Sequence, residues 1–266
     1  MPSHLRAAAA LAALLCAAPA AASDLEPRLT LAGPGASART VALTLDACSG
    51  ATDHRVLDLL IAERIPATVF VTRRWLDGNA AALKLLLAHR DLFEIENHGD
   101  AHVPAITDRP TMFGIRTAGA LEAVRREVEG GAEAIEAATG SRPRWYRDAT
   151  ARYSRDALTA IRADGYAIAG YSLNADMGTS LMAPMVARRV AAAKNGDVII
   201  AHVNQPGRAA GSGLAEGLRA LKASGARFVL LRDAETRTDD GPAIGPVVAR
   251  SRPPGAAEPA SGVTRH

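Results

Sequence analysis

The sequence of 266 residues is poor in cysteine and in aromatic residues, with two Cys, two Trp, four Tyr and four Phe. One cysteine, Cys16, lies in an Ala- and Leu-rich N-terminal segment that we expect to be removed. The remaining Cys48 cannot form an intrachain disulfide, so the fold has to depend on its hydrophobic core. The roughly 205 residues of patterned sequence are long enough to bury one.

Features that mark several other protein classes are also missing. Lys and Arg number 31 against 28 Asp and Glu, a formal net charge of +3, and the basic residues are scattered. Without a basic run interleaved with aromatic residues, a nucleic-acid partner is not expected. No G-x-G-x-x-G follows the first predicted strand and no G-x-S-x-G occurs, which argues against a dinucleotide-binding sheet and a serine hydrolase. No heptad pattern indicates an oligomeric state.

The two ends of the chain differ in composition from the part between them. Residues 1–23 have one Arg, an unbroken apolar stretch and then small residues, the pattern of a cleaved secretory signal peptide. We therefore expect export to the periplasm or out of the cell, and no later segment is apolar enough to cross a membrane. Residues 235–266 are rich in Pro, Gly, Ala, Ser and Arg, which predicts a disordered tail. Residues 24–234 are expected to form one domain.

Strand and helix patterns alternate along this domain. The predicted strands cover residues 40–46, 67–71, 93–97, 144–147, 167–173, 198–202 and 227–231. The predicted helices cover residues 54–64, 79–90, 117–138, 154–164, 183–194 and 213–223. Because the connections are helical, we expect the strands to pair in parallel, either in a wound open sheet or in a closed barrel.

Polar residues that can carry chemistry follow the predicted strands at their C-terminal ends. They are Asp46, the pair His98 and His102, Arg147, Asp176 with Asn174 two residues before it, and His202. Parallel sheets and barrels build active sites at this edge, because the return loops occupy the opposite edge. We therefore expect these side chains to converge on one site.

His98 and His102 are four residues apart, in the segment HGDAH. If the segment forms one helical turn, His98 and His102 share a face and can bind a metal ion together. The other residues fit a metal-assisted hydrolysis, in which a carboxylate takes a proton from water and an imidazolium gives one to a leaving amine. Asp46 is the candidate base and His202 the candidate acid, and a nearby Arg would keep the base ionised.

Five segments, in this order, resemble the motifs of the polysaccharide deacetylase family, the carbohydrate esterases with a NodB-type domain. They are TLDA at 44–47, HGDAH at 98–102, WYRDATARY at 145–153, YSLNADMG at 171–178 and IAH at 200–202. The resemblance covers nearly all of the patterned chain.

This resemblance implies a fold, a cofactor and a reaction. The fold is a single distorted (β/α)7 barrel of the α/β class, and the cofactor is Zn²⁺ or another divalent metal ion. The residues it assigns are Asp46 as base, His202 as acid, Arg147 and Asp176 as their respective partners, and His98 and His102 as metal ligands. The reaction is removal of an acetyl group, most readily an N-acetyl group, from a glycan.

One ligand of the family's metal ion is absent from this chain. The second Asp of the family's first motif corresponds to Ala47, which cannot ligate a metal. Asp53, Cys48 and Asp100 are candidates to replace it. Each also has a purely structural alternative: a helix cap for Asp53, a buried thiol for Cys48 and a surface acid for Asp100. We predict Asp53 as the third ligand, because a thiol is vulnerable in an oxidising compartment.

Two functions of different classes are compatible with these residues. The first is a metal-dependent deacetylase of an acetylated glycan such as an N-acetylglucosamine polymer, peptidoglycan or an exopolysaccharide. The second is a catalytically silent glycan-binding protein, which the loss of a ligand at Ala47 suggests. The presence of Asp46, Arg147 and His202 favours the enzyme, since binding alone would not require these residue types.

Overall fold

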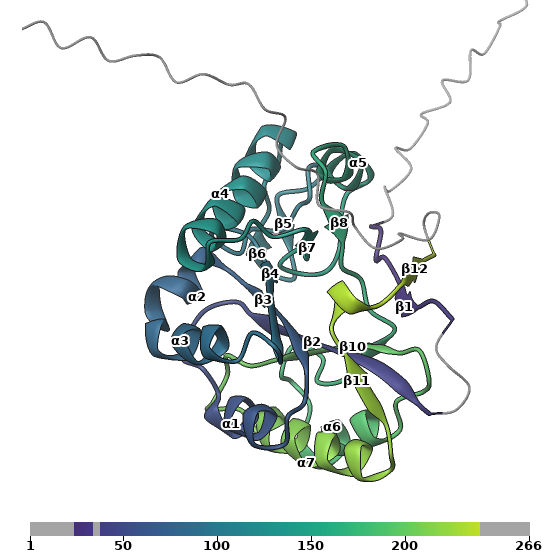
Figure 1. Ribbon diagram of the computed structural model, residues 1–266. Helices are drawn as coiled ribbons and strands as arrows, with labels where there is room; N and C mark the ends of the chain where they lie inside the picture. Colours follow the sequence, from purple (N-terminus) through teal and green to yellow (C-terminus); the bar gives the residue numbers. More distant parts are fainter. Residues whose placement is uncertain (1–23, 34–37, 240–266) are drawn as a thin grey trace, which may run out of the picture.

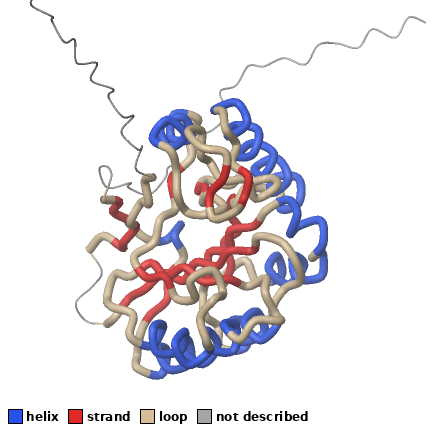
Figure 2. The backbone as a smooth tube through the Cα atoms, turned by 180° about the vertical axis from the view of Figure 1, so that it is seen from behind, coloured by secondary structure: helices blue, strands red, loops and turns tan. Residues whose placement is uncertain are grey.

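The computed structural model describes residues 24–33 and 38–239 (Figure 1). The predicted signal peptide, residues 1–23, and residues 240–266 of the predicted tail lie outside the described residues. Strands occupy the centre of the molecule and helices lie around them (Figures 1 and 2). The strands are parallel and curl into the distorted (β/α)7 barrel that the resemblance predicts.

The central sheet has a continuous path of seven parallel strands in the order β8-β7-β4-β3-β2-β10-β9, and β11 pairs with the start of β2. Their bounds are β2 Thr40–Ala47, β3 Ala67–Val71, β4 Phe93–Asn97, β7 Trp145–Tyr146, β8 Ala167–Ile168, β9 Leu173–Asn174, β10 Val198–His202 and β11 Arg227–Val229. Every residue of β2 is buried, as expected for a strand with neighbours on both edges and helices outside it.

Seven helices in the described part of the chain cover this sheet (Figure 1). They are α1 His54–Ala62, α2 Arg73–Gly78, α3 Ala80–Ala88, α4 Leu121–Thr139, α5 Arg155–Ala163, α6 Ala183–Ala191 and α7 Ala210–Ala223. The main core lies between the sheet and the helices, where Leu43 and Leu45 of β2 belong to the same buried cluster as Leu60 of α1 and Leu218 of α7. None of the described helices combines the length and the apolar character that crossing a membrane requires.

The N-terminal segment covers the open side of the barrel. Within the described residues, β8 and β9 lie at the two ends of the sheet path and do not pair. The backbone N–H of Leu29 donates to the carbonyl oxygen of Tyr171 at 3.3 Å, between these two strands. Leu29–Leu31 forms β1, which pairs antiparallel with β12, Thr236–Thr238. The predicted tail therefore begins too early at residue 235, because residues 236–238 are ordered by pairing with a distant strand.

The predicted strand 167–173 is two short strands rather than one. The chain leaves the sheet between them, and a Cβ at Gly170 would overlap the carbonyl oxygen of Pro27. Close approach of the N-terminal segment therefore requires glycine there and interrupts the strand.

Some short elements have no counterpart in the predicted set. They are α2, the N-terminal strand β1, its partner β12, and the hairpin of β5 (Thr111–Met112) and β6 (Ile115–Arg116).

Trp75 and Trp145 are both almost fully buried, at 1% and 3% exposure, so they pack in the interior and do not form a sugar-stacking surface.

Candidate active site

The predicted base is held by the predicted arginine in the interior of the barrel. The Nη1 of Arg147 donates to Oδ1 of Asp46 at 2.8 Å and to Oγ1 of Thr44 at 2.9 Å. Its Nε and Nη2 donate to backbone carbonyl oxygens at 3.1 Å, and the guanidinium lies 4.2 Å from the ring centroid of Phe70. Arg147 is fully buried, and these hydrogen bonds hold its guanidinium in one orientation. It is therefore a preorganised counter-charge for the carboxylate.

This arrangement keeps Asp46 ionised. Burial alone would raise the pKa of Asp46, but the positive charge of Arg147, with those of two histidines, lowers it below its usual value. A carboxylate kept ionised and positioned in this way has the form that a general base requires.

The predicted acid lies on the strand next to Asp46. β2 and β10 are paired in a register that sets His202 opposite Asp46. The Nδ1 of His202 lies 3.1 Å from both carboxylate oxygens of Asp176, and its backbone N–H donates to Oδ2 at 2.9 Å. Burial would lower the pKa of His202, but the hydrogen bond to Asp176 and the proximity of Cys48 raise it well above its usual value. His202 is therefore suited to hold a proton at neutral pH.

Of the two polar residues Asn174 and Asp176, it is Asp176 that contacts the predicted acid. Asn174 is in β9, and its Oδ1 accepts from the backbone N–H of Met177 at 2.8 Å. Asp176 is almost fully buried against His202. Asn174 therefore stabilises a turn, while Asp176, two residues later, orients the imidazole of His202.

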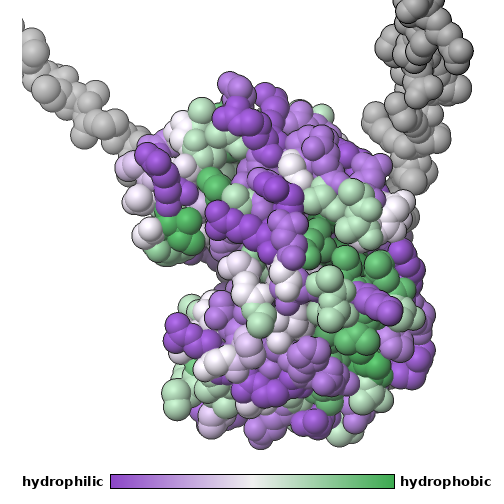
Figure 3. Space-filling model, turned by 90° about the vertical axis from the view of Figure 1, so that its left-hand side faces the viewer, coloured by the Kyte–Doolittle hydropathy of each residue, from purple (hydrophilic) through white to green (hydrophobic). Residues whose placement is uncertain are grey.

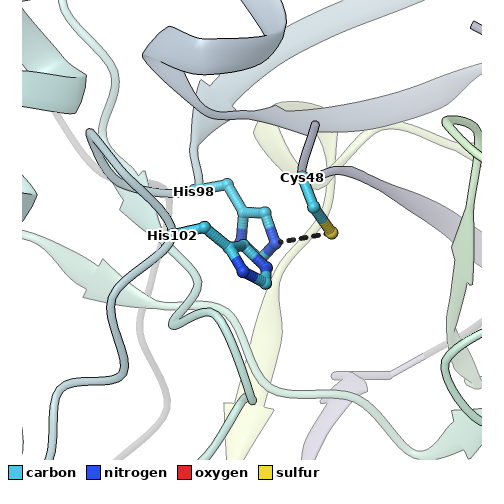
Figure 4. Close-up of side chains that lie close together, drawn as sticks. All are labelled: Cys48, His98 and His102. Atoms are coloured by element: carbon cyan, nitrogen blue, oxygen red, sulfur yellow. Dashed lines mark hydrogen bonds between the residues drawn. The ribbon is translucent and has the colours of Figure 1, made fainter. Parts of the chain in front are cut away.

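Three side chains from two strand ends form a compact group, the Cys–His cluster of Cys48, His98 and His102 (Figure 4). One ligand atom from each lies within 4.8 Å of the other two. The Sγ of Cys48 is 3.5 Å from Nε2 of His98, and the centroids of the two imidazole rings are 5.0 Å apart. A group of nitrogen and sulfur donors at this spacing can hold a divalent metal ion.

The two histidines meet through a loop and not through the helical turn considered above. Gly99 and His102 both have positive φ, +94° and +63°, which folds the segment back on itself. The carboxylate of Glu127 in α4 accepts from the backbone N–H groups of Ala101 and Val103 at 2.9 and 3.0 Å. At the start of the loop, the side chain of Asn97 accepts from the N–H of Gly99 at 2.8 Å. Neither Glu127 nor Asn97 is marked by the sequence motifs.

The two histidines are in different hydrogen-bonding states. The Nδ1 of His98 lies 2.9 Å from the carbonyl oxygen of Arg147, so it carries the hydrogen and leaves Nε2 facing the thiol. The Nε2 of His102 is buried and has no hydrogen-bond partner among the described residues. An imidazole oriented from behind and a second imidazole with an unpaired buried nitrogen fit the ligand set of a metal ion.

The charges of the cluster are strongly coupled. Burial would raise the pKa of Cys48, but the positive charge of His98 and its histidine neighbours hold it well below its usual range. Burial would lower the pKa of His98, whereas Asp46 and Cys48 raise it to about 9. A thiolate is the metal-binding form of cysteine, and a metal ion would have to displace the proton from His98.

Asp53, the predicted third ligand, is not in this cluster, where Cys48 lies beside the two histidines instead. Asp53 is the N-cap of α1: its Oδ1 accepts from the backbone N–H of Arg55 at 3.1 Å. The guanidinium of Arg55 also binds both carboxylate oxygens, at 2.8 and 2.6 Å. The carboxylate is therefore fully used by its own helix and does not fold back over the barrel.

The other acidic candidate, Asp100, is also engaged elsewhere. Its carboxylate binds the guanidinium of Arg73, with Nη2 donating to Oδ2 at 2.8 Å. Ala47, which occupies the position of the family's ligand, is fully buried in the hydrophobic core cluster. The strand ends at Ala47, and the Sγ of the next residue, Cys48, lies 3.5 Å from Nε2 of His98.

The predicted base, the predicted acid and two members of the cluster, Cys48 and His102, line one cavity of about 610 Å³. Among its lining residues are Asp46, Cys48, His102, Thr150, Asn174 and His202. The segment 149–152, which follows the buried Arg147 and Asp148, forms part of its wall. Seen from the side, the surface is indented at one edge of the molecule (Figure 3). The predicted site residues therefore line a cavity that a ligand can enter.

Comparison with known proteins agrees with the fold and the motifs. The family model of polysaccharide deacetylases matches residues 34–169, slightly more than half of the chain. The chain belongs to the polysaccharide deacetylase family, which makes it a hydrolase of the class acting on carbon–nitrogen bonds other than peptide bonds. A comparison with curated proteins finds no significant match.

Solved structures of carbohydrate esterase family 4 share the fold at low sequence identity. A peptidoglycan deacetylase from Bacillus subtilis is 21% identical with a TM-score of 0.60, covering 74% of this chain and 90% of its own. A family 4 acetyl xylan esterase from Clostridium thermocellum, in complex with a cobalt ion, is 22% identical with a TM-score of 0.58 and coverage of 73% and 89%. A family 4 pseudoenzyme from Bacillus anthracis is 18% identical with a TM-score of 0.58, and the match covers 75% of this chain and 66% of that one.

Proposed function

We propose that this protein is an exported, metal-dependent deacetylase that removes N-acetyl groups from a glycan. The observation that carries the proposal is that Cys48 and His102 of the Cys–His cluster line one cavity with Asp46 and His202, whose partners Arg147 and Asp176 are buried behind them. Family membership supports a glycan deacetylase, and the solved esterase that carries cobalt supports a divalent metal ion. The N-terminal signal pattern supports export to the periplasm or out of the cell, where polymeric glycans are found.

The proposed metal ligands are Cys48, His98 and His102. The unpaired buried nitrogen of His102 and the oriented ring of His98 support this assignment. A set of one thiolate and two imidazoles favours a borderline-soft ion, and we propose Zn²⁺. When bound, such an ion supplies Lewis acidity toward the acyl oxygen and lowers the pKa of water in the site.

The chain's own residues then move the protons. Asp46, kept ionised by Arg147, takes a proton from the attacking water. His202, kept protonated by Asp176, donates from Nε2 to the nitrogen of the leaving amine, because its Nδ1 is occupied by the carboxylate. Arg147 positions Asp46 and keeps it charged, and the amino sugar and acetate are the products.

The test measures metal content and acetate release in parallel. Purified mature protein is loaded with zinc or cobalt, and bound metal is quantified by elemental analysis. We expect about one equivalent in the wild type, loss of metal in Cys48→Ala and His102→Ala, and retention in Asp46→Asn, which should release no acetate from N-acetylchitooligosaccharides or peptidoglycan. With cobalt, a sulfur-to-metal charge-transfer band is expected in the wild type and not in Cys48→Ala. A wild type that stays metal-free after incubation with zinc would contradict the proposal.

A second candidate function is a catalytically silent glycan-binding protein. It is favoured by Ala47 and by the similarity to a pseudoenzyme, of which a mutant with restored enzymatic activity is also among the similar structures. This function predicts glycan binding that is indifferent to chelation and to His98→Ala. Measuring binding with and without a chelator, beside acetate release, separates the two candidates.

A further inference from the structure

The hairpin of β5 and β6 presents an aromatic side chain at its tip. Met112 pairs with Ile115, so Phe113 and Gly114 are the two residues of the turn. Both have positive φ, +50° and +79°, as in the tight hairpin turns that usually carry Asn-Gly or Gly-Gly. A phenylalanine is unfavourable in this conformation, so the turn itself gives no reason for its presence.

Phe113 is exposed and lies at the cavity that holds the predicted active site. Its exposure of 71% is the highest among the large hydrophobic side chains of the described residues. It lines the same cavity as Asp46, Cys48 and His202, together with the exposed Met177. An exposed apolar surface beside a catalytic cavity indicates contact with a ligand.

A polar group stands beside this ring at the cavity rim. The guanidinium of Arg152 lies 5.5 Å from the ring centroid of Phe113 and 2.7 Å from a carboxylate oxygen of Glu26. The hydroxyl of Tyr171 donates to the other carboxylate oxygen of Glu26. Glu26, Arg152 and Tyr171 all line the cavity. The rim thus combines an apolar ring with adjacent hydrogen-bonding side chains, which come from three separate segments of the chain.

A pyranose sugar has the complementary surface, since its ring carries apolar C–H groups on a face and hydroxyl groups around its edge. We propose that Phe113 is a stacking surface for a pyranose ring of the substrate, with the Glu26, Arg152 and Tyr171 group binding its hydroxyls. The substrate class is accordingly an oligomer or polymer of pyranose units, of which one unit occupies the catalytic centre while another lies on Phe113. The inference rests on the proposed function for the location of that centre.

The experiment compares glycan affinity with stability in variants of the metal-loaded protein. Binding of N-acetylchitohexaose, acetylated xylohexaose and oligomeric N-acetylglucosamine linked as in exopolysaccharide is measured by calorimetry. Phe113→Gly should weaken binding of the preferred oligomer about tenfold, and Phe113→Tyr should retain it. The glycine variant should melt at the wild-type temperature or above, because glycine suits the positive φ. Met182→Ala is the matched control, since Met182 is 66% exposed and lies outside the cavity lining.

The outcomes separate this inference from the proposed function. Weakened binding of Phe113→Gly with an unchanged melting temperature supports the inference, and a rise in KM larger than the fall in kcat supports it further. Equal binding by wild type and Phe113→Gly, equal weakening in Met182→Ala, or no binding of any oligomer by the wild type would overturn it. Acetate release that is unaffected by Phe113→Gly would overturn the inference and leave the deacetylase standing. Phe113-dependent binding without acetate release would support the inference and contradict the proposed deacetylase activity.

Discussion

Two groups of polar side chains lie next to one another in the barrel, and they are completed to different degrees. In the acid–base set of Asp46, Arg147, Asp176 and His202, each ionic side chain is paired with another member of the set. In the Cys–His cluster, the buried Nε2 of His102 has no partner in the described part of the protein. The protein thus preorganises the first group by itself, while the second needs a ligand to satisfy it. This difference matches the proposed roles, in which the first group moves protons and the second holds a metal ion.

The largest effect is expected from breaking the buried ion pair of the acid–base set. Arg147→Met leaves the carboxylate of Asp46 buried without its counter-charge, and removing one partner of such a pair costs about 3–5 kcal/mol. Urea unfolding measures the loss in free energy of unfolding. The double variant with Asp46→Asn is the control, because it removes the stranded charge and should recover part of the loss. A cost below about 1 kcal/mol for the single variant would show that the pair is not a preorganised unit.

This variant also has a pH signature. In the wild type the pKa of Asp46 is lowered, so the pair stabilises the fold above the usual pKa of Asp, and that stability is lost as the pH falls through the folded value. Without Arg147 the pKa of Asp46 moves upward, since burial raises it. The difference in stability between wild type and Arg147→Met should therefore narrow as the pH falls from neutral to acid. A constant difference would argue against an effect through the carboxylate.

A smaller effect is expected from changing the partner of the predicted acid. Burial lowers the pKa of His202, and the hydrogen bond and negative charge of Asp176, together with Cys48, more than offset it. Asp176→Asn removes that charge, so His202 should lose its proton at lower pH. The alkaline limb of the pH profile of kcat/KM should move to lower pH by about 1 unit. Asn174→Ala is the matched control and should leave the limb in place, and equal shifts in both variants would contradict the assignment of Asp176.

The smallest effect tests the comparison between Asp53 and Cys48. Asp53→Ala removes a helix cap and its contact with Arg55, which should lower the free energy of unfolding by about 1 kcal/mol. Because its carboxylate is used within α1, zinc content should not change. Cys48→Ala should show the opposite pattern, with metal lost and stability of the metal-free protein little affected. Loss of zinc in Asp53→Ala would restore Asp53 as the ligand.

Much of the fold could be predicted because each central element has a strong local pattern. The strands 67–71 and 198–202 coincide with apolar runs and the strand 93–97 with the alternating pattern FEIEN, and the structure gives all three the predicted bounds. The elements that could not be predicted are short or formed by distant pairing. Strand β12 exists because it pairs with β1, and the strand expected at 167–173 is interrupted because Pro27 approaches Gly170. Such contacts join segments far apart in the chain and leave no periodic signal.

The sequence alone determined that this is a parallel α/β protein with its titratable residues at the C-terminal ends of the strands. Hydrophobic periodicity and the alternation of strands and helices along the chain can both be read from the sequence itself. Only the tertiary structure decided which of these residues meet. Asp53 and Cys48 are both near Ala47 in the chain, but the helix that follows captures one carboxylate while the end of β2 turns the thiol toward His98. Phe113 reaches the same cavity from a hairpin that the sequence did not reveal. The proposed metal ligands and substrate contacts come from loops after different strands, and their distances are set by how the strands and helices pack.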